Sequence, residues 1–199
     1  MNNKNTIRIP KLFYWFLIAV MSLLLIGCMT SSSIDSNYVN DYQKALQSKA
    51  YDIEAAGLTA DEVEQQFLYV MGNMKSPDIL DRVDKTFAAD IYFNDTWHTC
   101  NNPEVLGGYL KRTGENVENI EVNVDDVVVS ESNAYVRWHM EFKVNADDEP
   151  IKSVGMTHLR FNEQLKIITY QDYWDGIEGF YRTLPVIGSV LEAVRKRMG

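Results

Sequence analysis

Regular alternation of apolar and polar residues in the last third of the chain is the feature that most restricts its fold. Five apolar side chains occupy every second position of one segment: Val136, Trp138, Met140, Phe142 and Val144. A period of two is typical of a strand with one buried face. With similar patterns on either side, the sequence predicts strands over residues 119–129, 135–144, 151–161 and 165–174, each separated from the next by a turn.

Helices are predicted before these strands. Thr59–Glu62 has the pattern of a capping box, and apolar residues at helical spacing follow it. Ser76–Asp78 and Asn102–Glu104 each combine a capping residue with a proline, which indicates two further helix starts. A short strand over Asp90–Asn94 lies between the second and third helices. Helices followed by an antiparallel meander predict an α+β fold, with the helices packed on one side of a curved sheet.

Charge excludes one class of partner and the histidines offer no metal site. The net charge is −9, although the first 27 residues carry only cations, so the remainder is more acidic still. Such a domain repels phosphate backbones, and we expect no nucleic-acid partner. The three histidines lack the short spacing of metal ligands, and no glycine-rich phosphate loop is present. We therefore expect neither a metal nor a cofactor.

The N-terminus has the pattern of a secretion signal. Residues 1–11 carry three cations, and residues 12–26 form an uncharged run that is too short for a comfortable membrane span. Leu25–Cys28 resembles the lipobox of bacterial prolipoproteins, which implies cleavage after residue 27 and acylation of Cys28 with chains such as palmitate. An uncleaved signal anchor is the alternative. Because Met29 rather than aspartate follows, the expected location is the outer membrane, with the protein facing the periplasm.

The remaining chain divides into three predicted parts. Residues 28–57 contain the lipidated cysteine and a tether, in which residues 37–57 form either a short helix or an extended spacer. Residues 58–175 form the folded domain. Residues 176–199 form an amphipathic helical tail with a basic end, suited either to a membrane surface or to packing on the outer face of the sheet.

Three short motifs carry a resemblance to a known family. Val136–Met140, Gly155–Phe161 and Tyr170–Asp175 resemble three successive strands of the SnoaL-like (polyketide cyclase-like) branch of the nuclear transport factor 2-like superfamily. The order and spacing of the elements over residues 58–175 also match. The resemblance implies a cone, in which a bent sheet wraps around the helices and leaves an apolar pocket in its mouth.

The resemblance also implies candidate catalytic residues. In limonene-epoxide hydrolase relatives, a tyrosine and an asparagine help to hold a water that an aspartate activates, and these positions match Tyr92, Asn94 and Asp172. The arginine and the second aspartate of that site fall on Trp138 and Met140, so epoxide opening loses its proton donor. The oxyanion hole of ketosteroid isomerase relatives matches no residues here.

Further side chains are candidates for the pocket. Trp138, Met140 and Trp174 would form its wall, and they would desolvate Asp172 and raise its pKa. Asp95 is either a turn-former or a pocket acid.

His98 lies in the same loop as Asp95, and His158 alternates with Val154 and Met156, so that it could face the interior. Either histidine could instead be a hydrogen-bonded structural residue.

Three functions follow as hypotheses. The first is a lipid-anchored periplasmic domain that binds a small hydrophobic molecule, lipid-derived or not, in its cone. The second is an isomerase, cyclase or hydrolase with Asp172 as the general base. The third is a protein-interaction module that uses the outer face of the sheet for a homodimer or another partner.

Overall fold

The computed structural model describes residues 37–198, of which residues 42–198 form one compact unit. Its helical elements are α2 (Asn37–Gln47), α3 (Ala60–Met71), α4 (Ile79–Thr86), α5 (Pro103–Glu115), α6 (Gly176–Gly179), the 3-10 turn η1 (Tyr181–Thr183) and α7 (Pro185–Met198). Its strands are β1 (Phe87–Asn94), β2 (Thr99–Cys100), β3 (Asn119–Ser130), β4 (Asn133–Lys143), β5 (Ile151–Phe161) and β6 (Ile167–Trp174). The predicted signal peptide and Cys28 lie outside the described residues.

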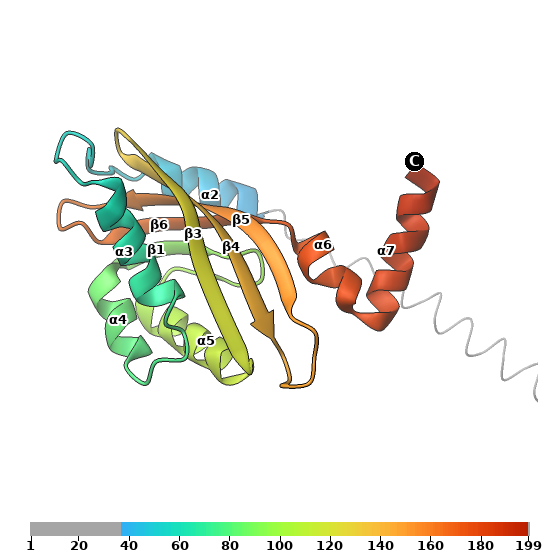
Figure 1. Ribbon diagram of the computed structural model, residues 1–199. Coiled ribbons are helices and arrows are strands. Elements are labelled where there is room, and N and C mark those ends of the chain that lie inside the picture. The colour runs from blue at the N-terminus through green and yellow to red at the C-terminus, as the bar shows by residue number, and fades with distance from the viewer. Residues whose placement is uncertain (1–36, 199) are drawn as a thin grey trace, which may run out of the picture. The chain divides into compact units, whose positions relative to one another are not determined.

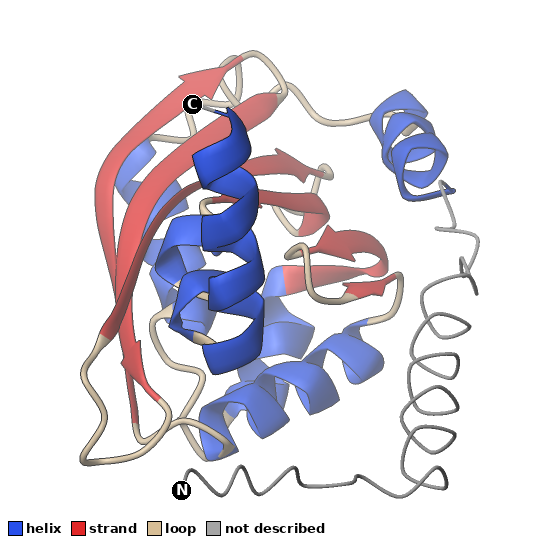
Figure 2. Cartoon of the chain, turned by 90° about the vertical axis from the view of Figure 1, so that its right-hand side faces the viewer, coloured by secondary structure: helices blue, strands red, loops and turns tan. Residues whose placement is uncertain are grey.

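The strands form one curved sheet in the order β2-β1-β6-β5-β4-β3 (Figure 1). All neighbouring pairs are antiparallel except β1 and β6, which are parallel. Helices α3, α4 and α5 lie against the concave side of the sheet, which bends around them (Figure 2). The α+β fold predicted from the sequence is therefore confirmed.

Two of the three predicted helix starts are confirmed by their capping bonds. The Thr59 side chain accepts a hydrogen bond from the Glu62 N–H, and the Glu62 carboxylate accepts one from the Thr59 N–H. The Asn102 side chain caps α5 in the same way, with Pro103 in the first turn. The start at Ser76–Asp78 is displaced, because Pro77 lies in a turn and α4 begins only at Ile79.

Two strand ends differ from the predictions for local reasons. Strand β1 begins at Phe87 rather than at Asp90, since the chain passes from α4 into the sheet without a loop. Strand β6 begins at Ile167 rather than at Leu165. The Asn162 side chain accepts hydrogen bonds from the N–H groups of residues 164 and 166, and Leu165 adopts a φ of 57°. This turn delays the strand by two residues.

The core fills the space between α3, α4, α5 and the concave face of the sheet. Its fully buried members are mainly large aliphatic and aromatic side chains, such as Phe67, Phe93 and Tyr170. Ile53 belongs to the same cluster and is completely buried. The core therefore includes a residue upstream of Leu58, inside the segment that the sequence analysis assigned to the tether.

The first part of the segment before the core is helical, since residues 37–47 form α2, whereas residues 48–57 form turns and loop. The two alternatives left open for residues 37–57 therefore each describe part of it. Within the compact unit, the C-terminal half of α2 lies on the convex side of the sheet. Arg160 of β5 donates hydrogen bonds to the carbonyl groups of Ala45, Leu46 and Ser48. Ala45 and Leu46 belong to the last turn of α2 and Ser48 follows it, so Arg160 donates to carbonyls at the C-terminal end of the helix, where intrahelical donors run out.

The C-terminal segment consists of α6, η1 and α7. Figure 1 shows α7 projecting away from the sheet, and its contacts are mainly with η1. No described side chain of α7 is buried. Within residues 37–198, none of the helices has both the length and the hydropathy needed to cross a membrane.

Candidate functional site

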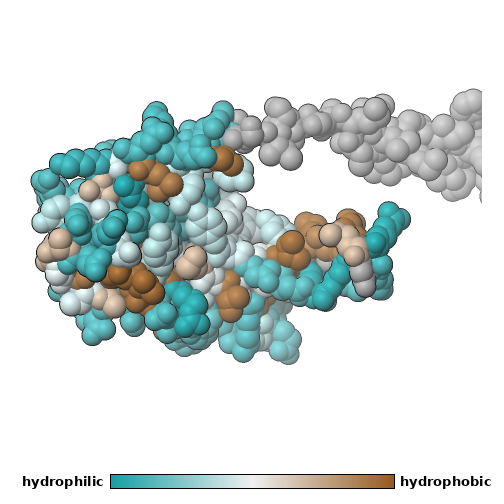
Figure 3. All heavy atoms as spheres, turned by 90° about the horizontal axis from the view of Figure 1, so that it is seen from above, coloured by the Kyte–Doolittle hydropathy of each residue, from teal (hydrophilic) through white to brown (hydrophobic). Residues whose placement is uncertain are grey.

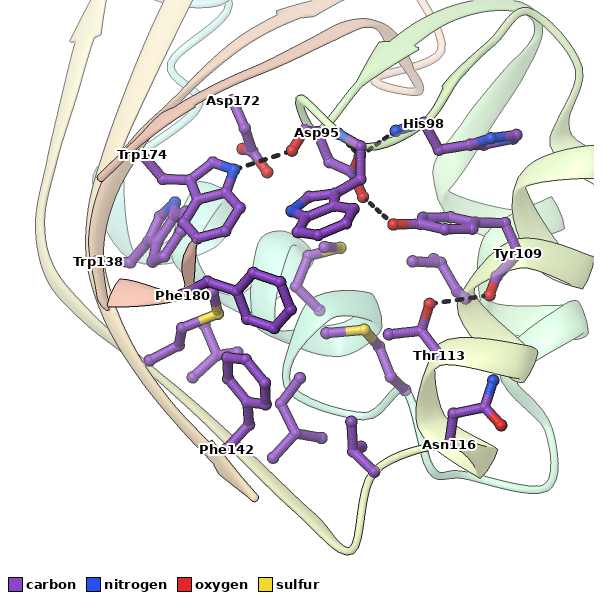
Figure 4. Close-up of a pocket in the computed structure, with 18 of the residues that line it drawn as sticks. Asp95, His98, Tyr109, Thr113, Asn116, Trp138, Phe142, Asp172, Trp174 and Phe180 are labelled. Atoms are coloured by element: carbon purple, nitrogen blue, oxygen red, sulfur yellow. Dashed lines mark hydrogen bonds between the residues drawn. The ribbon is translucent and has the colours of Figure 1, made fainter. Parts of the chain in front are cut away.

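A cavity of about 490 Å³ lies between the concave face of the sheet and helices α3 and α5. Its walls are largely apolar and come from several elements. They include Met71, Leu110, Ile120, Val122, Trp138, Met140, Phe142 and Phe180. A concave, mostly apolar cavity with a few polar groups is the usual form of a small-molecule site. The polar side chains that line it are therefore the candidates for chemistry (Figure 4).

Asp172 of β6 is the most deeply buried acid of the cavity. It is 5% exposed, and Figure 4 shows its carboxyl group directed into the cavity, between Trp174 and Asp95. Burial raises the pKa of Asp172 to about 8, because the ionised form loses its hydration, and the nearby charge of Asp95 acts in the same direction. Near neutral pH, Asp172 is therefore mainly in its protonated form.

A chain of hydrogen bonds leads to one oxygen of this carboxyl group. The Trp138 indole N–H donates to the Thr157 hydroxyl oxygen over 2.8 Å, and the Thr157 hydroxyl donates to Asp172 Oδ1 over 2.5 Å. The indole N–H occupies one lone pair of the Thr157 oxygen and leaves the hydroxyl proton for Oδ1. In this arrangement Oδ2 is the oxygen that is free to carry the acidic proton, and it accepts a long hydrogen bond of 3.3 Å from the Tyr170 hydroxyl.

Asp95 supplies a second carboxyl group from the loop after β1. Its Oδ1 accepts hydrogen bonds from the N–H groups of Trp97 and His98, and its Oδ2 accepts one from the Tyr109 hydroxyl over 2.5 Å. Burial raises the pKa of Asp95, although these hydrogen bonds partly oppose the rise. Asp95 is thus both the turn-former and the cavity acid that the sequence analysis offered as alternatives.

Aromatic side chains surround the cavity beside Asp95. Trp97 stacks on Trp174 and Tyr181, and it meets the edge of Phe180 at a centroid distance of 4.9 Å. The Trp174 indole N–H donates to the Asp95 carbonyl oxygen over 3.0 Å. This bond ties the end of β6 to the loop that carries the second acid.

His98 lines the cavity, as predicted, and it carries an unsatisfied polar atom. Its ring stacks on Tyr109 at a centroid distance of 4.5 Å. The ring nitrogen Nε2 is buried and has no hydrogen-bond partner among the described residues. Such an atom is uncommon in a folded protein and favours a site where a bound molecule or a water completes the hydrogen bonding.

Three predicted site residues lie on the opposite face of the sheet, outside the cavity. Phe93 points into the core, where it stacks on Tyr170, so its neighbours Tyr92 and Asn94 point the other way. The Tyr92 hydroxyl donates to Gln171 over 3.2 Å, and the Asn94 side chain accepts from the Thr96 N–H. The predicted water-holding role for Tyr92 and Asn94 beside Asp172 is therefore not supported by their position.

His158 is also outside the cavity, and it lies between the sheet and α2. The Tyr42 hydroxyl is 2.9 Å from its Nδ1, and Asn133 Oδ1 is 2.9 Å from its Nε2. Its ring stacks on Tyr135. Burial lowers the pKa of His158 to about 4, and the charge of Arg160 lowers it further. It is a neutral structural histidine, the alternative weighed in the sequence analysis.

Sequence reasoning missed the partners of the two acids. Thr157 lies directly opposite Asp172 in the β5–β6 pairing, and alternation along β5 could have placed its side chain toward the cavity. Tyr109 belongs to α5, where it follows the helical spacing of apolar residues, and this pattern gives no sign of a role for its hydroxyl group. Its contact with Asp95 depends on the loop between β1 and β2, for which the sequence carries no comparable signal. Within the described part of the chain, no cluster of three or more potential metal ligands exists.

Comparison with protein families gives one match. Residues 72–170 match the model of the SnoaL-like domain. This range contains α4, α5, strands β1 to β5 and the first part of β6, whereas α3 lies just before it. Among curated proteins, none matches the chain significantly.

Solved structures match over a similar region. An NTF2-like protein of unknown function from Exiguobacterium sp. 255-15 is 16% identical with a TM-score of 0.50, covering 57% of this chain and 97% of that chain. A protein of ketosteroid isomerase-like fold from Catenulispora acidiphila, solved in complex with trimethylamine, is 19% identical with a TM-score of 0.50, covering 61% and 91%. An LEH-like epoxide hydrolase from M. tuberculosis is 14% identical with a TM-score of 0.50, covering 61% and 86%. At these identities the likeness establishes the fold.

Proposed function

Since residues 72–170 match the SnoaL-like domain model and the fold is NTF2-like, we propose that the cavity binds a small, largely apolar molecule with a hydrogen-bond-accepting oxygen. The volume of about 490 Å³ is in the range of small-molecule sites. The fold is known to accommodate ligands, since the C. acidiphila protein was solved with trimethylamine. The apolar walls select for an apolar body, and Asp172 selects for the polar atom.

One observation carries this proposal: a buried carboxyl group at an apolar wall, one of whose oxygens already accepts from Thr157. The bond from Thr157 occupies Asp172 Oδ1, which leaves the Oδ2 proton for a ligand. A buried donor without an acceptor costs free energy, so a carbonyl or ether oxygen at this position would be favourable. An anionic ligand group would be less suitable, because Asp95 already contributes negative charge nearby.

Native mass spectrometry of the full chain from its own host tests this function. We expect a stoichiometric small molecule that organic solvent releases, and we expect Met140→Trp, which fills the cavity, to abolish it. Val128→Trp adds the same side chain at an exposed position of β3 and is the matched control. A wild-type chain without bound molecule, or a molecule that Met140→Trp retains, would contradict the proposal.

A second candidate function is general acid–base catalysis on the bound molecule. The observation that favours it is the pair of carboxyl groups, Asp172 and Asp95, whose surroundings differ although both line one cavity. Paired acids with different environments are typical of sites where one group donates a proton and another accepts it. The hydrogen bond from Tyr109 favours the ionised form of Asp95, which is then the base, with neutral Asp172 as the acid.

Asp172→Asn separates the two functions. The asparagine oxygen can still accept from Thr157 and its amide can still donate, so binding is retained. Proton transfer from this position is lost. If the Asp172→Asn variant binds the molecule but, unlike the wild type, no longer converts it, catalysis is supported. If the variant and the wild type behave alike in the binding assay and in the turnover assay, binding alone is supported.

The location of the protein is part of the proposal. Leu25–Cys28 supports acylation of Cys28, which would hold the protein on the outer membrane facing the periplasm. Mass spectrometry of the N-terminal peptide would detect the acyl chains. A Cys28→Ala variant from which residues 1–27 have been removed should no longer be found in the membrane fraction. Peptides from residues 1–27 on the membrane-bound protein would contradict this location.

A homodimer through the sheet also remains a proposal. The convex face carries exposed Val154 and Met156, beside the part that α2 covers. Analytical ultracentrifugation of the wild type and of Val154→Asp would test it. A dimer that the substitution dissociates would support the proposal, whereas a monomeric wild type would contradict it.

A further inference from the structure

Helix α7 presents an apolar stripe that nothing in the described chain covers. Val186, Ile187, Val190 and Val194 are 76%, 44%, 59% and 47% exposed. Val186, Val190 and Val194 follow one another at intervals of four residues, and Ile187 lies three residues before Val190, so all four lie on one face of the helix. Figure 3 shows hydrophobic residues on the projecting C-terminal segment. A stripe of this length is unusual on a helix that projects away from its own domain.

Cations lie at the end of the same helix. The last turn contains Arg195, Lys196 and Arg197, whereas the only acid of α7 is Glu192. Arg195 and Lys196 make ion pairs that are well exposed, and Arg197 pairs with no described residue. Exposed pairs of this kind hold their partners weakly, so the cations can exchange them for other anions.

We infer that α7 lies along an anionic lipid surface, with the apolar stripe at the boundary between headgroups and acyl chains and the three cations among the headgroups. An amphipathic helix with aliphatic residues on one face and cations in its last turn is suited to this position. The remainder of the chain is acidic and would be repelled by such a surface. The basic last turn of α7, at the projecting end of the domain, therefore provides a local attraction to an anionic membrane.

A protein partner fits the stripe less well. Protein interfaces usually centre on aromatic or arginine anchors that fill pockets, and this stripe consists of short aliphatic side chains in a single row. The inference stands on α7 alone and does not depend on the cavity or on its ligand.

Amide hydrogen exchange of the full chain in vesicles tests the inference. A helix that packs mainly on η1 and buries no described side chain opens easily, so we expect fast exchange of the α7 amides in neutral phosphatidylcholine vesicles. With phosphatidylglycerol added, exchange of α7 should be about tenfold slower, because each cation near the surface is attracted. The amides of α4 in the same molecules are the internal control and should not change.

Substitutions in the stripe and in the last turn test whether the apolar residues and the cations each cause the protection. Val190→Asp should remove the protection of α7 in anionic vesicles, whereas Val128→Asp, at an equally exposed valine of β3, should leave it unchanged. Replacement of residues 195–197 by glutamine should abolish the difference between the two lipid compositions. Exchange that is the same in both lipids would overturn the inference. So would protection that depends on protein density but not on lipid charge, which would indicate a second copy of the chain on the stripe.

Discussion

At the scale of single residues, Asp172 shows how the site costs stability. Its raised pKa means that the native state keeps a proton that the unfolded chain releases above about pH 4. Between about pH 4 and about pH 8 the native state binds more protons, so this residue lowers the stability progressively as the pH rises. The site thus retains an acid that the fold alone would not favour.

Asp172→Asn should therefore stabilise the protein near neutral pH. The amide stays neutral and keeps the bond from Thr157, so we expect a gain on the order of 2 kcal/mol at about pH 7.5 that shrinks towards about pH 4.5. Urea unfolding at the two pH values measures it. A variant that is less stable than the wild type at both would show that the carboxyl proton is not held as described.

Gly155 is a second residue whose size matters, because the Trp138 indole lies directly over it. A Cβ at this position would be 2.5 Å from Trp138 Cζ2. The indole is tied to Thr157 and cannot shift without losing that bond. The small residue on β5 therefore determines where the cavity wall stands.

Gly155→Ala should destabilise the protein by about 1–3 kcal/mol through overpacking. Gly108→Ala in α5 is the matched control, since its Cβ would meet only the flexible end of Arg112 at 3.4 Å. That change should be neutral or stabilising by up to about 1 kcal/mol. Thermal unfolding of both variants gives the comparison, and equal effects would contradict the role assigned to Gly155.

At the scale of elements, the β-strands were the most predictable part. The β5 strand has the predicted bounds, and β4 differs by two residues at its start and one at its end, because strict alternation leaves one register that buries the apolar face. The start of β6 was not predictable, since a side-chain bond from Asn162 decides it.

The same alternation explains which part of the site was predicted. Asp172 faces inward with Tyr170, two positions before it on β6. Tyr92 and Asn94 were assigned from family positions without regard to Phe93, whose inward side chain determines the orientation of both. Asp95 and Tyr109 meet only through a loop and a two-residue strand, so no periodic pattern could have paired them.

The contact between α2 and the sheet should make stability fall on acidification. The lowered pKa of His158 means that the unfolded chain binds a proton below about pH 6.5 that the native state accepts only near about pH 4. Tyr42, Tyr135 and Arg160 surround the ring, and among the residues that the structure describes no acid contacts it to stabilise its charged form.

His158→Gln should remove this loss, which is on the order of 3 kcal/mol between these pH values. Thermal unfolding as a function of pH compares it with the wild type. Val128→Gln, at an exposed position of β3 without a titratable group, is the control and should keep the wild-type slope. Identical slopes for all three chains would exclude His158 as the cause.

At the scale of the whole molecule, the C-terminal segment divides into a part that builds the cavity and a part that does not. Phe180 belongs to the cavity wall, and Gly179 packs so closely on Ser153 that a Cβ would be 2.6 Å from that side chain. Beyond η1, α7 contributes no buried side chain.

A chain that ends at Leu184 should therefore keep its fold, with Tm within about 3 °C of the wild type. A chain that ends at Asp175 loses Phe180 and the cover of the cavity, and it should lose the bound molecule as well as stability. Calorimetry and native mass spectrometry of both truncations provide the test. A large loss of Tm in the longer chain would show that α7 supports the core.

The tryptophans of this chain give the cavity its own optical reporter. Three of the four, Trp97, Trp138 and Trp174, line the cavity, so most of the indole fluorescence of the folded protein originates there. A molecule that displaces water from these walls will shift the emission to shorter wavelengths, and one with an overlapping absorption band will quench it. Candidate compounds can thus be screened on the unlabelled protein, and the emission wavelength will report whether each one binds next to the tryptophan side chains.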